Sequence, residues 1–128
     1  AIDFYGKLEV SGKKTFVLGD MLELGSDSKA LHEKIGEIAV NQNIDKIIFV
    51  GKEMSYGYFI AKEIKNAKNL LVELESLESY DDGSVFELTE KLEKCAKSGD
   101  LFFFKGSRGI KLERIADKLA TKVVKNEI

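Results

Sequence analysis

Three short apolar runs, each ending at a glycine, constrain the fold more than any other feature of this chain. They are residues 15–19, 47–51 and 101–106. Such runs lack the polar–apolar alternation of a half-exposed strand, so each indicates a strand buried on both faces. Residues 70–72 (Leu-Leu-Val) form a fourth candidate, although acidic residues follow them closely. These segments predict the strands of one buried sheet.

Helical patterns lie between and after these runs. Ser84, followed three positions later by Glu87, resembles a capping box for the third predicted helix. Strands that alternate with amphipathic helices need right-handed crossovers, which give a parallel sheet covered on both sides. We therefore predict an α/β, Rossmann-like domain with a mostly parallel sheet. The positions expected to face inward are Leu31, Ile35, Ile38 and Ala39; Met54, Tyr58, Ala61 and Ile64; Val85, Leu88, Leu92 and Cys95; and Leu112, Ile115, Ala116, Leu119 and Val123.

The size of the chain fits one domain. It has 128 residues, 44% of them hydrophobic, and it contains no proline, repeat or low-complexity stretch. A chain of this length can bury roughly two thirds of its unfolded surface. We therefore expect residues 1–128 to form a single domain without an internal linker. Because the chain opens at Ala1 without a strong start signal, we expect a domain excised from a larger protein.

Charge, apolar runs and cysteine content limit the partners and the cellular compartment that this chain is expected to have. The 20 basic and 22 acidic residues nearly cancel and are interspersed, so there is no basic patch for a nucleic acid or an anionic membrane. No apolar run approaches the roughly 18 residues of a membrane span, and no secretory pattern opens the chain. We expect a cytoplasmic protein. For the single Cys95, an inert core thiol is the favoured interpretation and a reactive thiol the alternative.

Three loops that follow the predicted strands are the candidate ligand sites. In parallel sheets ligands bind beyond the carboxyl ends of the strands, which selects residues 19–28, 51–55 and 105–110. The last loop offers Lys105 and Arg108 with the Ser107 hydroxyl, a set that suits a carboxylate or a phosphate. Solvated surface charge is the competing interpretation. The chain contains neither Gly-x-x-x-x-Gly-Lys-Ser/Thr nor Gly-x-Gly-x-x-Gly, so the usual cradles for ATP and dinucleotides are missing.

The loop of residues 19–28 carries the acidic candidates. Asp20 directly follows a strand, where a carboxylate can accept from a ribose hydroxyl or a substrate ammonium. A turn residue that bonds its own backbone is the equal alternative. Glu23 lies between two leucines that we expect to pack while Glu23 points outward. His32 is the only histidine, which leaves no His-based metal site or Ser-His-Asp set. It falls one residue off the apolar face, so a packed or capping histidine is the favoured interpretation.

Two segments resemble a known family. Residues 17–25 read Val-Leu-Gly-Asp-Met-Leu-Glu-Leu-Gly, followed by Leu-His and Ile-Gly pairs, and residues 104–109 read Phe-Lys-Gly-Ser-Arg-Gly. Together they resemble the C-terminal domain of the Mur ligases, over nearly the whole chain from about Lys14. The first segment is similar to the branch that adds D-alanyl-D-alanine to UDP-N-acetylmuramoyl tripeptide in peptidoglycan precursor synthesis.

The resemblance implies one part of a three-domain, ATP-dependent ligase. In that family a first domain holds the UDP-sugar, a central domain binds ATP and Mg²⁺, and the C-terminal domain brings the incoming amino component. ATP phosphorylates the substrate carboxylate, and the amine attacks the acyl phosphate through a tetrahedral intermediate. This domain alone is then expected to be an inactive monomer, with no catalytic residue and no metal ligand of its own.

The same resemblance implies which residues line the pocket for the dipeptide and the nucleotide. Arg108 or Lys105 would hold the dipeptide carboxylate, Ser107 would help to orient it, and His32 would support the site. The opening residues do not match the Asp-Ala-Tyr-Asn-Ala-Asn-Pro stretch that contacts the nucleotide in the family. The full set of expected substrate-binding residues is Asp20, Met21, Glu23, Lys105, Ser107 and Arg108.

Two other interpretations stay open. A response-regulator receiver is a doubly wound domain of similar length, and Asp20 and Lys105 imitate its acidic residue and its lysine. It also needs a phosphoacceptor aspartate after a middle strand, whereas Gly51-Lys52-Glu53 follows the second predicted strand. The other interpretation is a non-catalytic α/β interaction domain, which an upstream Gly-Lys-Thr P-loop in the parent reading frame would argue against.

Overall fold

The structure is a computed structural model, and it describes residues 2–119 and 124–126. Five strands form one parallel sheet in the order β3-β2-β1-β4-β5. This confirms the predicted α/β, Rossmann-like fold. Receiver domains have the order 2-1-3-4-5, so that interpretation is wrong. The strands are β1 (Lys14–Gly19), β2 (Lys46–Val50), β3 (Glu73–Leu77), β4 (Leu101–Lys105) and β5 (Val124–Asn126).

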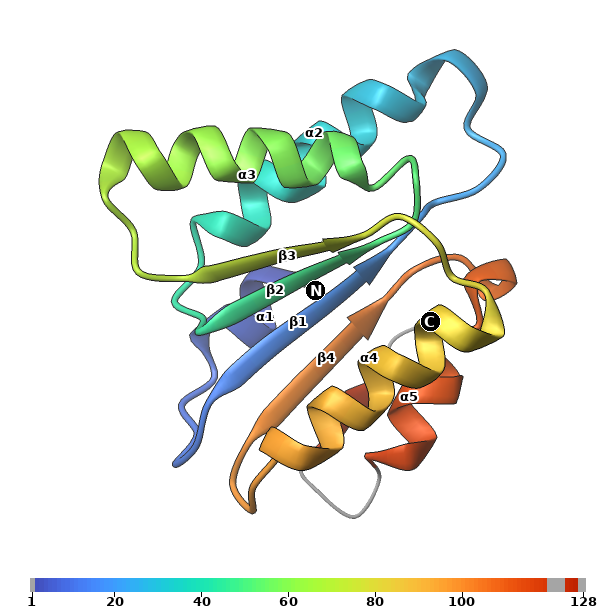
Figure 1. Cartoon of the computed structure of the whole chain (residues 1–128). Coiled ribbons are helices and arrows are strands. Elements are labelled where there is room, and N and C mark those ends of the chain that lie inside the picture. Colours follow the sequence, from blue (N-terminus) through green and yellow to red (C-terminus); the bar gives the residue numbers. More distant parts are fainter. Residues whose placement is uncertain (1, 120–123, 127–128) are drawn as a thin grey trace.

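Helices cover both faces of the sheet (Figure 1). The chain moves outward from β1 to β3 and then returns past β1 to β4, so right-handed crossovers place the later helices on the opposite face. Two 3-10 turns, η1 (Gly25–Asp27) and η2 (Arg108–Ile110), lie in the loops after β1 and β4. One face carries α1 (Ile2–Lys7), α2 (Ser28–Val40) and α3 (Ser55–Lys68), and the other carries α4 (Asp82–Cys95) and α5 (Glu113–Lys118).

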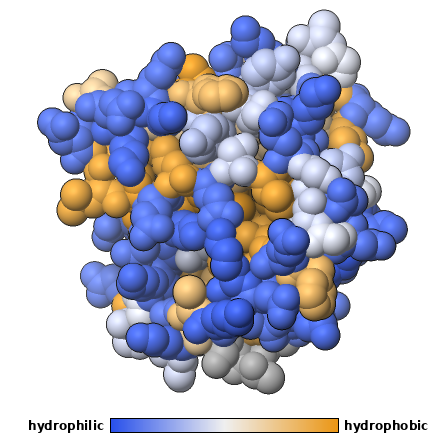
Figure 2. Space-filling view, in the orientation of Figure 1, coloured by the Kyte–Doolittle hydropathy of each residue, from blue (hydrophilic) through white to orange (hydrophobic). Residues whose placement is uncertain are grey.

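The central strands divide their side chains between two cores. In β1, Phe16 and Leu18 pack on the side of α2 and α3, whereas Val17 packs on the side of α4 and α5. Burial on both faces explains why these strands are continuous apolar runs. The face of the molecule in Figure 2 is mostly hydrophilic, with hydrophobic residues in separate patches. Within the described residues, every helix is too short or too polar to cross a membrane.

The fourth predicted strand is displaced. It lies at Glu73–Leu77 and not at residues 70–72, and Leu71 is 96% exposed. β3 is an edge strand whose residues are only partly buried or exposed. It therefore lacks the continuous apolar run that marks the central strands. The apolar residues just before it, Leu70 and Leu71, drew the predicted strand to residues 70–72 instead.

Helix α4 differs from the prediction at both ends. Asp81 caps it by accepting a hydrogen bond from the Ser84 N–H at 2.7 Å, so the predicted capping box that began at Ser84 is wrong. At the other end Cys95 is exposed and not in the core. The backbone becomes extended at Ala96, and the Ala96 side chain takes the inward position instead.

Helix α2 is rotated from its predicted face. Leu31 and Ile38 are 38% and 37% exposed, whereas His32 is fully buried. Gly36 of α2 meets the backbone of Gly57 in α3 so closely that neither position has room for a Cβ. This close crossing turns the buried side of α2 toward α3 as well as toward the sheet.

The last predicted helix is shorter than its pattern. Helix α5 ends at Lys118, with Ile115, Ala116 and Leu119 buried as predicted. The predicted inward position Val123 lies outside the described residues.

Candidate functional site

The two charged loops leave the same edge of the sheet, as predicted. We call residues 19–28 the acidic loop and residues 105–110 the basic loop. They follow β1 and β4, which are parallel neighbours and the strands between which the strand order reverses. In open α/β sheets this reversal point is the usual place for a ligand.

Hydrogen bonds join the two loops directly. The Ser107 N–H donates to the Asp20 carbonyl at 3.0 Å, and the Ser107 Oγ accepts from the Leu22 N–H at 2.8 Å. Beneath them the strand ends touch, because a Cβ on Gly106 would lie 3.1 Å from the Gly19 Cα. The loops therefore form one continuous surface, and a ligand has to bind on its outer side.

Asp20 is an internal residue of this edge. Its side chain is 3% exposed, and its Oδ1 accepts a hydrogen bond from the Met54 N–H at 2.7 Å. Burial raises the pKa of the Asp20 carboxyl, although hydrogen bonds from the backbone of Met54 and Glu53 act in the opposite direction. The carboxylate ties the acidic loop to the loop after β2, so the alternative interpretation of a turn residue that bonds its own backbone is wrong. Contact of Asp20 with a substrate stays a prediction.

His32 holds the acidic loop from below. Its Nε2 accepts a hydrogen bond from the Met21 N–H at 2.9 Å, and its Nδ1 lies 2.6 Å from the Ser28 carbonyl oxygen. Because a carbonyl only accepts, Nδ1 carries the ring hydrogen and Nε2 is left as the acceptor. The Ser28 hydroxyl donates in turn to Glu53 Oε1 at 2.6 Å. The structure confirms a packed histidine, and its orientation explains how it can support the loop.

The tip of the acidic loop faces outward. Glu23 is exposed, as predicted, and has a left-handed backbone with φ +63°. Met21 is half-buried and packs against the core. Leu22 is 39% exposed, and its Cδ1 would lie 2.8 Å from a Cβ on Gly109 of the basic loop. Glu23 is thus a carboxylate of this loop that a ligand can reach, and the exposed Asp27 in η1 is another.

The basic loop presents its two cations differently. Lys105 and Ser107 are half-buried, and Arg108 is exposed at the start of η2. Within residues 2–119 and 124–126, the Lys105 ammonium and the Arg108 guanidinium make no hydrogen bond or ion pair. Both cations are therefore available to an anionic ligand.

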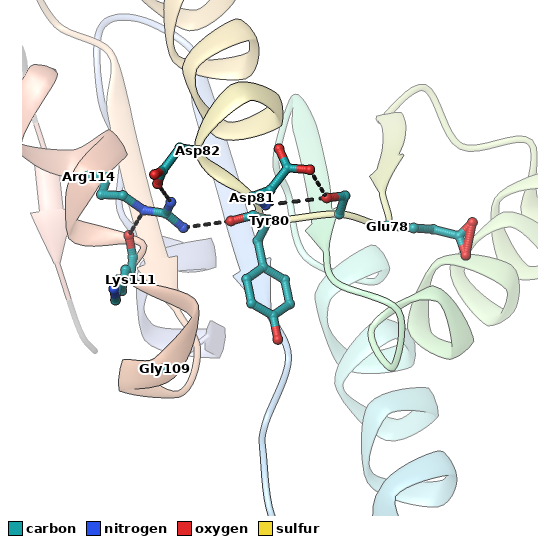
Figure 3. A pocket seen from close by; sticks show the side chains of 8 residues that line it. Glu78, Tyr80, Asp81, Asp82, Gly109, Lys111 and Arg114 are labelled. Atoms are coloured by element: carbon teal, nitrogen blue, oxygen red, sulfur yellow. Dashed lines mark hydrogen bonds and ion pairs between the residues drawn. The ribbon is translucent and has the colours of Figure 1, made fainter.

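Arg114 braces the basic loop from outside. Its guanidinium donates to the carbonyl oxygens of Ile110 at 2.7 Å, Tyr80 at 3.0 Å and Lys111 at 3.0 Å. It also pairs with Asp82 at 2.9 Å. Figure 3 shows the guanidinium lying between Asp82 and the backbone of Tyr80. Tyr80 and Asp82 lie 34 and 32 positions away from Arg114, and no local sequence signal predicts these two contacts.

An open hollow of about 650 Å³ lies beside this arginine (Figure 3). It is lined by residues 78–82 and by Gly109, Lys111 and Arg114. The guanidinium donates four hydrogen bonds to internal partners, so it chiefly braces the wall of the hollow. Across the described part of the chain, no group of three or more His, Cys, Asp or Glu residues is arranged to hold a metal ion.

Comparisons with known proteins identify the family to which the chain is similar. The family model described as Mur ligase, glutamate ligase domain, matches residues 1–108. The chain is 36% identical over 125 residues to the UDP-N-acetylmuramoyl-tripeptide--D-alanyl-D-alanine ligase of Bacillus subtilis (strain 168), across 93% of this chain and 24% of that protein. It is 29% identical over 119 residues to the ligase of the same name from Rickettsia prowazekii, across 88% of this chain and 22% of that protein.

A solved structure agrees with the fold. The crystal structure titled MurF from Acinetobacter baumannii superposes with a TM-score of 0.68 at 22% identity, and the match covers 94% of this chain and 24% of that chain. At that identity the likeness shows the fold alone. The chain spans about a quarter of the length of the curated relatives it matches.

Proposed function

The chain belongs to the Mur ligase family, and on that premise we propose that it is the C-terminal domain of a ligase that adds D-alanyl-D-alanine to UDP-N-acetylmuramoyl tripeptide. Two curated relatives that match along most of the chain carry the name of that ligase. The remaining three quarters of such a protein would bind the other substrates. The part of this domain is to position the incoming dipeptide.

The observation that carries the proposal is the joined pair of loops at the strand-order reversal. The Asp20 carboxylate is satisfied inside the fold, whereas Arg108 is exposed and Lys105 is half-buried, with no partner for either cation among the described residues. A guanidinium fits a carboxylate with two hydrogen bonds. The basic loop therefore suits the carboxylate of the dipeptide, with Ser107 fixing the position of the loop.

The nucleotide and its magnesium fit this chain poorly. The sequence lacks a P-loop, and the described residues hold no cluster of metal ligands. We place ATP and Mg²⁺ mainly in the part of the protein outside this chain, with the two loops closing over the nucleotide. The chain alone would then show no ligase or ATPase activity. A cytoplasmic setting belongs to the same proposal, because ATP and a UDP-linked precursor are the substrates.

The contribution of the domain to the reaction is positional. The amine of the dipeptide has to reach an acyl phosphate that the rest of the enzyme forms, and the two loops hold the dipeptide in place for that attack. Holding two reactants in a productive geometry can lower a barrier by roughly 7–11 kcal/mol in favourable cases. The domain would supply one half of that arrangement, and the UDP-sugar site the other half.

The test is Arg108→Ala in the full-length ligase that carries this domain. Loss of a charged hydrogen-bonding partner costs roughly 1.5–3 kcal/mol, so the KM for D-alanyl-D-alanine should rise about tenfold to a hundredfold. The KM values for the UDP-sugar and ATP should stay unchanged. Lys52→Ala is the matched control, because Lys52 is an exposed cation in the loop after β2, at the same edge of the sheet.

Two results would contradict the proposal. If the KM for ATP or the UDP-sugar rises while the dipeptide value stays constant, Arg108 serves a different ligand. If no constant changes and turnover is normal, the basic loop is a solvated surface turn.

A further inference from the structure

Glu23 has a backbone conformation that its local structure does not explain. Three non-glycine residues among those described have a left-handed backbone: Glu23, Asn69 and Lys111. This conformation is unfavourable for a residue with a side chain. Asn69 and Lys111 end helical turns, where it lets their N–H groups bond the carbonyls of Lys65 and Arg108. Glu23 ends no helix, so its strain has a different origin.

The neighbours of Glu23 hold it in place. The Met21 N–H bonds to His32 Nε2 at 2.9 Å, and the Leu22 N–H bonds to Ser107 Oγ at 2.8 Å. The two residues before Glu23 are thus anchored to different parts of the fold. Strained residues persist only where surrounding contacts determine them, and they cluster at functional sites.

The same anchoring sets an anionic residue and a cationic residue on adjoining segments of the two loops. Glu23 directly follows Leu22, and Arg108 directly follows Ser107, and Leu22 and Ser107 are joined by a hydrogen bond of 2.8 Å. Both side chains are exposed. Among the described residues neither charge forms an ion pair, either with the other or with a third group.

We propose that Glu23 binds the ammonium group of the incoming dipeptide while Arg108 binds its carboxylate. This rests on the proposed function. A free dipeptide carries both charges near neutral pH, because its amino group titrates near pH 8 and its carboxyl near pH 3.5. Its two residues span at most about 7 Å, so a short zwitterion fits two opposite charges on adjoining loops. Glu23 then selects a dipeptide whose amino group is not acylated, and the Glu23 carboxylate can accept the proton that the ammonium has to lose before the nitrogen attacks the acyl phosphate.

The test uses two substitutions of Glu23 in the full-length ligase. Glu23→Gln keeps the left-handed strain and removes the charge, whereas Glu23→Gly removes both. Both should raise the KM for D-alanyl-D-alanine roughly tenfold to a hundredfold and leave the UDP-sugar and ATP values unchanged. Glu23→Gly should also raise the melting temperature. Asn69→Gly is the control, because it relieves the same backbone conformation at the C-terminus of α3 and should change no kinetic constant.

A second probe removes the charge from the ligand. N-acetyl-D-alanyl-D-alanine keeps the carboxylate and lacks the ammonium, and it can be measured as a competitive inhibitor. The wild type should bind it roughly tenfold to a hundredfold more weakly than the dipeptide, and Glu23→Gln should bind the two about equally.

The outcomes separate this inference from the proposed function. If Glu23→Gln leaves the dipeptide KM unchanged while Arg108→Ala raises it, the role of Glu23 is overturned and the proposed function stands. If neither substitution changes the dipeptide KM, the proposed function itself is contradicted. A lower melting temperature for Glu23→Gly would overturn the argument from strain.

Discussion

The acidic and basic loops occupy equivalent places after neighbouring strands, yet they use their charged side chains in opposite ways. The acidic loop turns Asp20 inward to cap the loop after β2, and His32 holds its backbone from within. The basic loop leaves Arg108 in solvent and is fixed through the Ser107 bonds and the brace of Arg114. The first loop is a scaffold that leaves the carboxylates of Glu23 and Asp27 exposed, and the second is the surface that a ligand meets.

This difference separates charged side chains that hold the fold together from charged side chains that are available to a ligand. A buried carboxylate is tolerated because hydrogen bonds replace its lost hydration, and Asp20 has such bonds. An exposed guanidinium keeps its hydration and stays available. The internal partners of a charged residue therefore decide its role, and its position after a strand does not.

The largest expected effect tests whether the acidic loop is a scaffold. A Cβ at Gly51 would collide with the Asp20 carboxylate, and Gly51 has φ +114°. Gly51→Ala should lower the free energy of unfolding by roughly 2–5 kcal/mol, from about 1–2 for the backbone and about 1–3 for the displaced buried carboxylate. The measurement is urea denaturation.

Gly25→Ala is the control for that effect. Gly25 lies in the acidic loop with φ +60°, and nothing lies within 4 Å of its Cβ position. It should lower the free energy of unfolding by only about 1–2 kcal/mol. Equal losses at the two positions would mean that the Asp20 contact adds nothing, and the contrast between the loops would weaken.

A smaller effect concerns acid. Burial raises the pKa of Asp20 in the fold, so the folded state takes up a proton before the unfolded state does. The contribution of Asp20 to the free energy of unfolding therefore becomes more favourable as the pH falls through its folded pKa. This gain is complete below its unfolded pKa of about 3.9. As the pH is lowered from about 7 to about 4, the wild type should therefore gain stability relative to Asp20→Asn, measured as the free energy of unfolding of each protein.

At Glu75 the effect of pH on stability has the opposite sign. Burial raises its pKa, but hydrogen bonds from Lys46 and Lys91 outweigh that cause and lower it. Its contribution is present above its unfolded pKa and is lost as the pH falls through the folded value. The advantage of the wild type over Glu75→Gln should therefore shrink on acidification. If the two variants drift in the same direction with pH, Asp20 is not the buried anchor described above.

The sequence predicted the central sheet well because its physical signal is local. Strands β1, β2 and β4 are buried on both faces, and each reads as an apolar run within one or two residues of its observed bounds. The edge strand β3 carries Glu73 and Glu75 and was displaced for that reason. The burial of His32 depends on the contact between Gly36 and Gly57 of two helices, which no pattern within α2 alone reveals.

The sequence predicted that the two candidate loops lie at one edge of the sheet, but it did not predict the hydrogen bonds within them. The order of strands and loops was enough to place Asp20 and Arg108 at one edge, because parallel strands share their carboxyl ends. Met54, which bonds to Asp20, and Tyr80, which bonds to Arg114, each lie 34 residues from their partner, so local spacing gave no sign of these contacts. The role of a charge depends on such distant partners, and this is why Asp20 and Arg108 looked equivalent in the sequence.

The most direct test of the central claim, that the basic loop holds the dipeptide carboxylate, changes both the protein and the substrate. The KM values of D-alanyl-D-alanine and its C-terminal amide would be compared in the full-length ligase and in Arg108→Ala. The account predicts that the amide loses roughly tenfold to a hundredfold in the wild type, that the variant loses as much with the dipeptide, and that the variant no longer distinguishes the two. If the losses multiply, so that Arg108→Ala still discriminates against the amide as strongly as the wild type does, Arg108 does not bind the carboxylate and the claim is contradicted.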